Sequence, residues 1–510
     1  MHLEILDFVV VAIYFTSLLA LGVYSSRQQA SQEDYFMAGR NVHWLLAGVS
    51  VVATLLSTVS FVALPGEVIR NGIGYFGSMF AFILIIPVVN RIVIPSLMSM
   101  PVTSIYDYLE YRFGKSVRTV GAIVFVLIRL IWISLILYTA ARAVSPMTGW
   151  PIPVLVVIMG LVTVFYTTLG GMKAVLWSDF AQFVILLGGA IWIPCQIALS
   201  TGSGPWTWWS TFAESSRAQT PAFSFDPTER TTLVGMILVT FMWNICTHSS
   251  DQVAAQRYLC TGSAKEARRS FWAFSIGNIG VIILLMFCGM ALFHFRYLAD
   301  NLPMAEFQVQ IASQADNAMP EFIAKHLPAG VTGLILAALL AAAMSSVSSG
   351  INSISAVVVT DLMNAPRDVP SQPSSLKFAR SLALGTGVIA MLGAVAVEYL
   401  MSAVDWNLID LIERINHLFV APLGAVFFAG IWFRHVGRVA VLLGFGAGVF
   451  TSAAVSFSKW LFQYDVSFMW ILPCSFAVSL LVAYAAGFCF DAPSSAQLKV
   501  LYQPKSGRQE

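Results

Sequence analysis

Charged residues are scarce in this sequence. Of its 510 residues only 11% are charged, whereas a soluble domain carries about 25%. Hydrophobic residues make up 58% of the chain, and the mean hydropathy is +0.78. The net charge of +2 is too small to indicate a nucleic-acid partner. The composition therefore leaves little room for a soluble domain and predicts an integral membrane protein.

Cysteine frameworks and common catalytic motifs are also missing. The six cysteines are scattered without a CxxC pair, which is typical of small apolar residues rather than of disulfides or metal ligands. The chain has no HExxH or GxSxG motif and no paired catalytic carboxylates in its apolar runs. Because these catalytic motifs are missing, we do not expect an enzyme.

The first apolar run, residues 5–23, lacks the basic start and the cleavage site of a signal peptide.

The apolar runs are long enough for many membrane crossings, because one crossing takes roughly 20 apolar residues. Thirteen are expected, at residues 5–25, 42–66, 73–98, 120–144, 152–168, 174–199, 231–256, 272–296, 327–360, 376–399, 408–432, 438–457 and 467–488. The sequence therefore predicts an all-α integral membrane protein with about 13 transmembrane helices.

Basic residues are unevenly divided between the loops. With the N-terminus outside, the loops 99–119, 257–271 and 361–380 face the cytoplasm and hold much of the Lys and Arg. Cytoplasmic loops carry such an excess. We therefore expect the N-terminus outside and the C-terminus in the cytoplasm, in a plasma membrane that we take to be a bacterial inner membrane.

Two spans contain residues that interrupt a helix. In the second span the run ALPG (63–66) places a proline, which removes a backbone donor, beside a glycine, which weakens the helix. Five spans later, MWNICTHSSDQ (242–252) is unusually polar. Interrupted spans at corresponding positions of two halves are typical of secondary transporters with inverted repeats. The alternative is a proline kink in one helix and a helix end in the other.

The stretch LAAAMSSVSSGINSIS (340–355) places six serines and an asparagine in an apolar span. At helical spacing Ser345, Ser349 and Asn352 share one face. Such a stripe serves either close helix packing or the binding of a hard cation. A cation site also needs a carboxylate and freed backbone carbonyls from another helix. Asp179 in the sixth span offers the carboxylate, and the break expected after Ala53 in the second span offers the carbonyls. The alternatives for Asp179 are a helix-end position and a local ion pair with Lys173.

Four patterns carry a resemblance to a known family. They are ALPG at 63–66, GGMKAVLWSDFAQ at 170–182, SSDQVAAQRYL at 249–259 and AAAMSSVSS at 341–349. Together they resemble the sodium:solute symporter family, in the family's order and over almost the full chain. The resemblance implies a LeuT-like fold of two inverted five-helix repeats with broken first and sixth core helices. It also implies that inward sodium flow drives solute uptake.

The resemblance further implies the sodium ligands. The main site takes three backbone carbonyls and two hydroxyls, from Ala53, Leu56, Ala342, Ser345 and Ser346. A possible second site, present in some members, takes one carboxylate and three hydroxyls, from Asp179, Ser345, Ser348 and Ser349. The family often has threonine where this chain has Ser346, which keeps the oxygen.

The solute site departs from two branches of the family. Val59 and Ser60 replace the polar pair of the sugar branch, and Leu55 replaces the aspartate of the proline branch. Arg129 in the fourth span offers a planar fork suited to a carboxylate. A similar arginine binds the solute carboxylate in the sialic acid branch. We therefore expect an anionic solute, and the alternative is an internal ion pair of Arg129.

Other side chains are further candidates for the solute site. Those with hydroxyl or amide groups are Thr54, Ser57, Thr58, Ser60 and Asn244, and those that offer apolar walls are Phe76, Phe80 and Trp243. The polar residues that follow the interrupted seventh span are expected to form a network at its inner mouth. They are His248, Asp251, Gln252 and Arg257.

The sequence thus predicts a sodium-coupled symporter that imports a small organic solute, such as a sialic acid or another monocarboxylate. The alternatives are a sodium-coupled sugar or amino-acid symporter and a proton-coupled transporter of the same fold. We expect a monomer in the lipid bilayer, without a nucleic-acid partner. The predicted divisions are an extra helix and loop (1–41), the first repeat (42–199), an extracellular loop (200–230), the second repeat (231–432) and two additional helices with a tail (433–510).

Overall fold

The structure is a computed structural model, and it describes residues 3–29, 31–56, 58–99, 102–229, 231–363, 373–403, 408–490 and 492–498. These residues form helices and connecting turns, with no strand among them. The predicted all-α class is therefore confirmed.

The helices of the first half are α1 (Ile5–Ser26), α2 (Gln32–Met37), α3 (Trp44–Leu55), α4 (Thr58–Asn71), α5 (Gly77–Val88), α6 (Ile94–Met98), α7 (Tyr106–Phe113), α8 (Lys115–Thr148), α9 (Ile152–Thr201) and α10 (Pro205–Ala213). Those of the second half are α11 (Leu233–Ser250), α12 (Gln252–Leu259), α13 (Ala264–Asp300), α14 (Met304–His326), α15 (Val331–Val357), α16 (Pro373–Ala403), α17 (Leu408–Trp432), α18 (Arg438–Ser456), α19 (Ser458–Phe462), α20 (Ile471–Ala486) and α21 (Ser495–Leu498). Short 3-10 segments are η1 (Ala38–Arg40), η2 (Ile73–Phe76), η4 (Ser216–Ala218) and η6 (Phe468–Trp470), and π segments are η3 (Val89–Val93) and η5 (Val358–Leu362).

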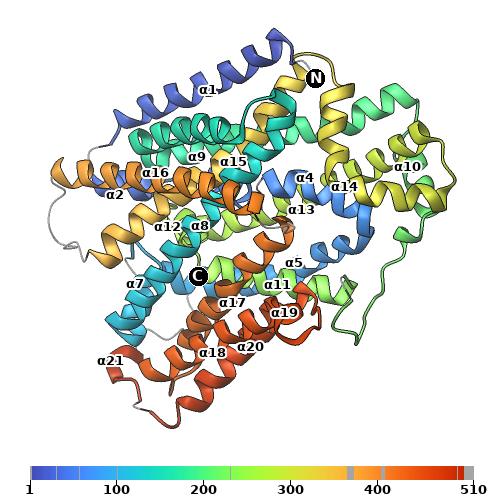
Figure 1. The fold of residues 1–510 in the computed structure, drawn as a ribbon. Coiled ribbons are helices and arrows are strands. Elements are labelled where there is room, and N and C mark those ends of the chain that lie inside the picture. The colour runs from blue at the N-terminus through green and yellow to red at the C-terminus, as the bar shows by residue number, and fades with distance from the viewer. Residues whose placement is uncertain are drawn as a thin grey trace.

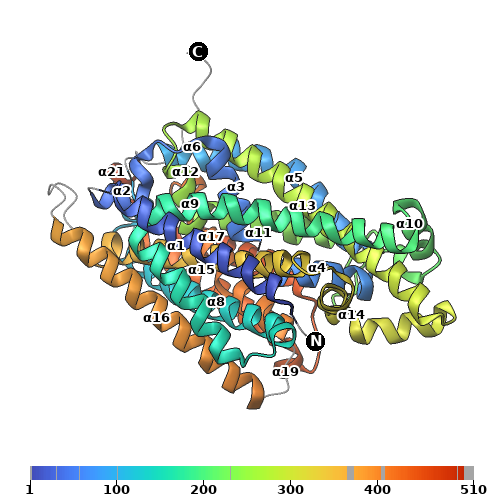
Figure 2. The ribbon, with the colours of Figure 1, turned by 90° about the horizontal axis from the view of Figure 1, so that it is seen from above.

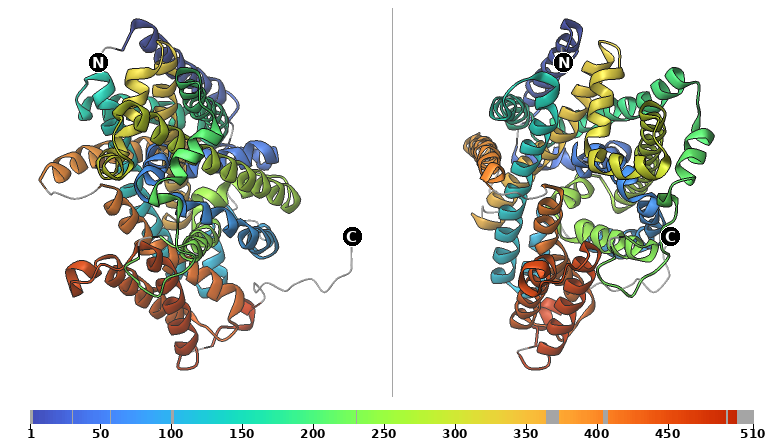
Figure 3. Two further views of the ribbon diagram at one scale, coloured as in Figure 1. Left: turned by 90° about the vertical axis from the view of Figure 1, so that its right-hand side faces the viewer. Right: turned by 45° about the vertical axis from the view of Figure 1, so that its right-hand side comes forward.

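The serine-rich helix α15 is the centre of the bundle. It packs against α9, α8, α1, α16 and α3. In Figure 1, α1 and the C-terminal helices α18 and α20 lie on opposite sides of the molecule, and Figure 3 shows the same separation from two further sides. Figure 2 shows α10 and α14 at one end of the bundle and α2 at the other. The site residues predicted on α15 therefore lie in the interior.

Ten helices among the described residues are long and apolar enough to cross a membrane, or eleven when the bent pair α3–α4 is taken as one span. The difference from thirteen has two visible causes. Helix α9 contains both predicted spans 152–168 and 174–199, and only the part of α17 from His417 is counted, as a short apolar helix. The multi-span character is confirmed, and the number thirteen stays a prediction.

Gly171 separates the two halves of α9. Its backbone is left-handed in φ (φ 54°, ψ −155°), which interrupts the helix at the point where the two predicted spans meet. A Cβ atom here would lie 2.7 Å from the Tyr35 carbonyl oxygen of α2. Only glycine combines this backbone angle with this close approach.

The first turn of α15 is attached to α1. The buried Asp7 accepts hydrogen bonds through Oδ1 from the backbone amides of Gly330 (2.8 Å) and Gly333 (2.7 Å). A carboxylate at a helix N-terminus satisfies amides that have no partner within the helix. A Cβ atom on Gly333 would come within 2.6 Å of the Asp7 Cα, so glycine permits this contact.

Small residues let α15 pack closely along its length. In its most apolar 18-residue window, 94% of the residues are buried, against 22% for α1. A Cβ atom on Gly350 would lie 2.4 Å from a methyl carbon of Ile133 on α8. Close helix contact through glycine, alanine and serine is the usual packing mode inside a membrane.

Candidate functional site

The second predicted span is broken between α3 and α4. The last backbone bond of α3 runs from the Leu56 amide to the Val52 carbonyl, at 2.8 Å. Leu56 then adopts an extended backbone (φ −88°, ψ 102°), and the two helices meet at 59°. Carbonyls in the last turn of a helix lack intrahelical partners. The break therefore frees the carbonyls that a cation site requires.

The predicted break at Pro65 and Gly66 is wrong, because both residues lie inside α4. Instead, the backbone at these two residues lies close to two neighbouring helices. A Cβ atom on Gly66 would lie 3.1 Å from the Ala315 carbonyl oxygen of α14. A Cβ atom on Gly289 of α13 would lie 2.8 Å from the Pro65 carbonyl oxygen. The Pro–Gly pair permits close packing, and the chain breaks nine residues earlier.

The serines of α15 meet the freed carbonyls of α3. The hydroxyl of Ser345 donates to the Ala53 carbonyl and that of Ser346 to the Thr54 carbonyl, each at 2.7 Å. Both hydroxyls also lie near the Ala342 carbonyl, at 3.2 and 3.4 Å. Four of the five predicted main-site residues are thus gathered in one buried cluster of oxygens, the kind of ligand set that holds sodium in broken-helix transporters.

Leu56, the fifth predicted main-site residue, is buried at the end of α3, 4% exposed. It is the residue that leaves the helix, so its carbonyl belongs to the broken segment. The residue after it, Ser57, lies outside the described residues.

Asp179 is fully buried and faces α3 and α12. Its Oδ2 accepts hydrogen bonds from Ser50 (2.5 Å) and Thr54 (3.2 Å) and forms an ion pair with Arg257 Nη2 at 3.1 Å. Lys173, the local partner considered above, contacts Gln28 instead. Asp179 is therefore not a helix-end residue in solvent, and the side chain that pairs with it, Arg257, is 78 positions away in the sequence.

The guanidinium of Arg257 occupies the middle of this cluster. Its Nη2 donates to Thr54 Oγ1 at 2.7 Å and to the hydroxyl of Ser349, and its Nε donates to Ser50 at 2.9 Å. Two of the predicted second-site residues, Asp179 and Ser349, thus share one cation that belongs to the protein. Ser348 differs, because its hydroxyl bonds the Ser345 carbonyl of its own helix at 3.0 Å.

One oxygen of the Asp179 carboxylate remains available in this cluster. Within the described part of the chain, Oδ1 is buried and has no hydrogen-bond partner. Leaving such an atom without a partner is costly in a dry interior. A bound cation at Oδ1 would remove that cost, so the residues fit a second sodium ion.

The predicted solute-binding residue Arg129 lies on α8 and pairs with Asp251. Its Nη2 donates to Asp251 Oδ2, and the two side chains are 14% and 15% exposed. The guanidinium also lies over the Phe125 ring, 5.9 Å from its centroid. The internal ion pair considered as the alternative for Arg129 is therefore present in this structure.

Asp251 stands at the second helix break. α11 ends at Ser250, Asp251 adopts an extended backbone (φ −98°, ψ 116°), and α12 begins at Gln252. The Asp251 Oδ1 accepts the Val253 amide at 2.9 Å, which caps α12. The break falls inside the polar stretch 242–252 that the sequence singles out.

The start of α7 and the loop before it fix this break in place. Tyr106 donates its hydroxyl to the Ser250 carbonyl at 2.9 Å, and the Gln252 side chain bonds the Ile105 amide (2.8 Å) and the Thr103 carbonyl (3.0 Å). The backbone on both sides of Asp251 is therefore fixed by the neighbouring segment.

The remaining solute candidates are spread over several environments. Thr54 belongs to the Asp179 cluster, whereas Asn244 donates within its own helix to the Thr240 carbonyl at 2.9 Å. Residues Ser60, Phe76 and Trp243 are half-buried. Thr58 begins α4, and its side chain is not among the described ones.

Phe80 has the least favourable position among these candidates. It is 51% exposed and lies on the same face of α5 as Ile83 and Leu84, which are also exposed, while Phe82 and Ile85 form the buried face. An exposed apolar helix face is typical of contact with lipid. The structure therefore does not bring Phe80 together with the other candidates.

Two residues matter more to the site than the sequence indicated. Asp251 and Arg257 were expected in a polar network at the inner mouth. In the structure Asp251 pairs with Arg129, and Arg257 pairs with Asp179. The motif SSDQVAAQRYL contains both, with Asp251 at the N-cap of α12 and Arg257, of opposite charge, six residues later in its last turn. That spacing was the available signal.

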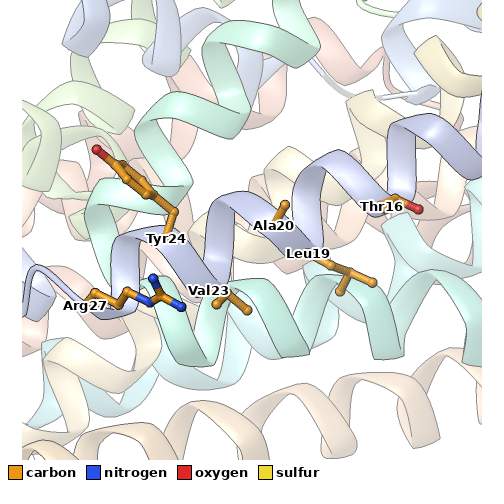
Figure 4. Close-up of a pocket in the computed structure, with 6 residues that line it drawn as sticks. All are labelled: Thr16, Leu19, Ala20, Val23, Tyr24 and Arg27. Carbon is orange, nitrogen blue, oxygen red and sulfur yellow. The ribbon is translucent and has the colours of Figure 1, made fainter.

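A shallow surface pocket lies elsewhere. It is lined by one exposed stripe of α1, namely Thr16, Leu19, Ala20, Val23, Tyr24 and Arg27 (Figure 4). None of the predicted site residues lines it, so it has no part in the site described above.

Comparison with known proteins decides the family. The model of the sodium:solute symporter family matches residues 35–448. The chain belongs to the sodium:solute symporter family. The symporter is 30% identical over 434 residues to the sodium/sialic acid symporter of Proteus mirabilis, over 84% of this chain and 85% of that relative. It is 28% identical over 448 residues to human sodium-coupled monocarboxylate transporter 1, over 87% of this chain and 72% of that relative.

A solved structure has the same fold. It is that of a Na⁺-coupled sialic acid symporter in a substrate-bound, outward-open state, described as revealing a novel Na⁺ site. The TM-score is 0.85 at 26% identity, covering 96% of this chain and 99% of that one. The predicted LeuT-like fold is therefore confirmed. The protein is a sodium-coupled symporter in a membrane and not an enzyme, and sodium is its coupling ion.

Proposed function

We propose that this symporter uses the sodium gradient to import a small organic anion with a carboxylate, either a sialic acid or another monocarboxylate. The observation that carries the proposal is Arg129. It holds a guanidinium fork directly beside the break between α11 and α12, where its present partner is itself a carboxylate. The relatives named for sialic acid and for monocarboxylates support the same solute class.

The sodium that drives uptake binds, in this proposal, between α3 and α15. The ligands are the carbonyls of Ala53, Leu56 and Ala342 and the hydroxyls of Ser345 and Ser346. Their support is the cluster of buried oxygens at the α3 break. A second sodium at Asp179, with Ser345, Ser348 and Ser349, is supported by the unpartnered carboxylate oxygen.

The proposed membrane topology rests on the uneven division of basic residues between the loops. We infer the N-terminus outside and the C-terminus in the cytoplasm of a bacterial inner membrane, with repeats at 42–199 and 231–432. Elements next to the basic loops, such as α2 and α12, lie in contact, while α10 and α14 gather at the opposite end (Figure 2). A single chain contains both proposed binding sites, which supports a working monomer.

Uptake into liposomes tests the coupling and the solute together. The purified protein is reconstituted, and uptake of labelled N-acetylneuraminate and of lactate is measured with an inward sodium gradient and, separately, with an inward proton gradient. We expect the sodium gradient alone to drive accumulation. Uptake that does not depend on the sodium gradient contradicts the proposal. Uptake driven by the proton gradient favours the proton-coupled alternative, in which Asp179 carries the proton.

A matched serine pair tests the main sodium site. Ser345→Ala removes a hydroxyl that meets α3, and we expect the sodium concentration for half-maximal uptake to rise about tenfold, which is about 1.4 kcal/mol. Ser355→Ala is the control, because within the described part of the chain its buried hydroxyl bonds the Ile351 carbonyl of its own helix alone, at 2.7 Å. If both variants showed the same sodium dependence, Ser345 would serve helix packing and would not bind sodium.

A further inference from the structure

The partner of Arg129 has the chemistry of the proposed solute. Asp251 presents a carboxylate oxygen to the guanidinium, which is the interaction that a sialic acid or a monocarboxylate would make. The two residues are 122 positions apart and belong to different helices. Their pairing is therefore a product of the fold and not of local sequence.

The two oxygens of Asp251 have different tasks. Oδ1 accepts the Val253 amide and caps α12, while Oδ2 meets Arg129. The adjacent backbone is fixed through Ser250 and Gln252. Movement of the Arg129 guanidinium away from Oδ2 therefore breaks this pair and can leave the cap and the helix break unchanged.

We propose that Asp251 is a built-in substitute for the solute carboxylate, which occupies Arg129 when the transporter is empty and gives way when the solute binds. The inference rests on the proposed function, because it takes Arg129 as the binding group for the solute carboxylate. Asp251 is then a specificity-determining residue that every solute must displace.

Charge balance explains why such a substitute is useful. An arginine cannot release its charge, and an unpaired guanidinium at membrane depth is costly. With Asp251 in place, the empty carrier has a neutral pair at this position when it returns to bind again. In the loaded carrier the solute neutralises Arg129, and sodium enters the same protein interior with a positive charge to balance the freed Asp251.

The empty carrier must return during net uptake but not during exchange of solute for solute. This difference yields the test. Asp251→Asn keeps an oxygen for the cap on Val253 and removes the charge that competes for Arg129. We expect its affinity for N-acetylneuraminate or lactate, measured by calorimetry in saturating sodium, to rise at least tenfold. Net uptake should slow at least tenfold, while exchange into liposomes preloaded with the same solute should stay within twofold of the unsubstituted protein.

Two further variants complete the experiment. Asp251→Ser also caps a helix without charge, and it provides the same measurements if Asp251→Asn does not fold. Asp465→Asn is the matched control, because it removes a carboxylate from an exposed ion pair with Arg414, and it should change neither affinity nor net uptake.

The outcomes separate this inference from the proposed function. Weaker or unchanged binding by Asp251→Asn, or an equal loss of exchange and net uptake, overturns the inference and leaves Asp251 as a helix cap alone. If the unsubstituted protein binds neither probe, or if Arg129→Gln binds them normally, the proposed function fails and the inference fails with it.

Discussion

Two ion pairs connect the short helix α12 and its cap to the surrounding bundle, and they have opposite polarity. In one, α8 supplies the cation, Arg129, and the break supplies the anion, Asp251. In the other, α9 supplies the anion, Asp179, and α12 supplies the cation, Arg257. The acid lies at the N-cap of α12 and the base in its last turn, which is the arrangement that the helix dipole favours.

The two pairs differ in how completely they are enclosed. Asp179 and Arg257 are 0% exposed; the hydroxyls of Ser50 and Thr54 bond both of them, and that of Ser349 bonds Arg257. Arg129 and Asp251 are 14% and 15% exposed, and Arg129 also lies over one aromatic ring. A buried pair needs additional hydrogen bonds to offset the loss of water. The enclosed pair therefore has the contacts of a structural element, while the more open pair keeps some exposure to solvent.

Removal of one partner from the enclosed pair should have the largest effect on stability. Arg257→Gln leaves the Asp179 carboxylate buried without a cation, so we expect the free energy of unfolding to fall by about 3–5 kcal/mol. Thermal melting of the purified protein in detergent should show this loss as a lower melting temperature. The double variant Asp179→Asn, Arg257→Gln should recover more than half of the lost stability, because it leaves no unpaired charge. Equal melting of the single and double variants would contradict a coupled pair.

The open pair should respond with a smaller loss of stability and a larger loss of function. Arg129→Gln should lower the free energy of unfolding by only about 1–3 kcal/mol, since Asp251 remains partly exposed. Binding of N-acetylneuraminate or lactate should weaken at least a hundredfold. If both single variants, Arg129→Gln and Arg257→Gln, were equally unstable, the distinction between an open and an enclosed pair would be wrong.

Ser349→Ala should have the smallest effect of the three. The hydroxyl lies 3.0 Å from Thr54 Oγ1 and accepts from Arg257, so its loss should cost about 1 kcal/mol. If a second sodium binds at Asp179, the cooperativity of sodium-driven uptake should also fall, which a sodium titration of the uptake rate would show. Ser355→Ala again serves as the control, and a Ser349→Ala variant with unchanged sodium cooperativity speaks against a second ion.

The sequence was informative where polarity alone decides. Serines in an apolar span predicted that α15 faces protein, and the structure buries Ser345, Ser346, Ser348 and Ser349 almost completely. The charge of Arg129 in an apolar run likewise predicted a partner. Both inferences rest on the cost of polar groups in lipid, which holds whatever the fold.

The sequence did not predict which residues these polar groups pair with. Asp179 and Arg257 are 78 positions apart, and a nearby lysine, Lys173, was the simpler guess for Asp179. The break expected between Ala53 and Gly66 was right at its start, where Leu56 leaves the helix, and wrong at its end, because Pro65 stays inside α4. Pairing and helix ends at these points are set by tertiary contacts that no local pattern contains.

The contact of Asp7 with the first turn of α15 has a practical consequence. Any displacement of α15 must either carry α1 with it or break two hydrogen bonds to a buried carboxylate. A purification tag or fluorescent label attached just before α1 therefore lies close to an anchor of the helix that carries Ser345.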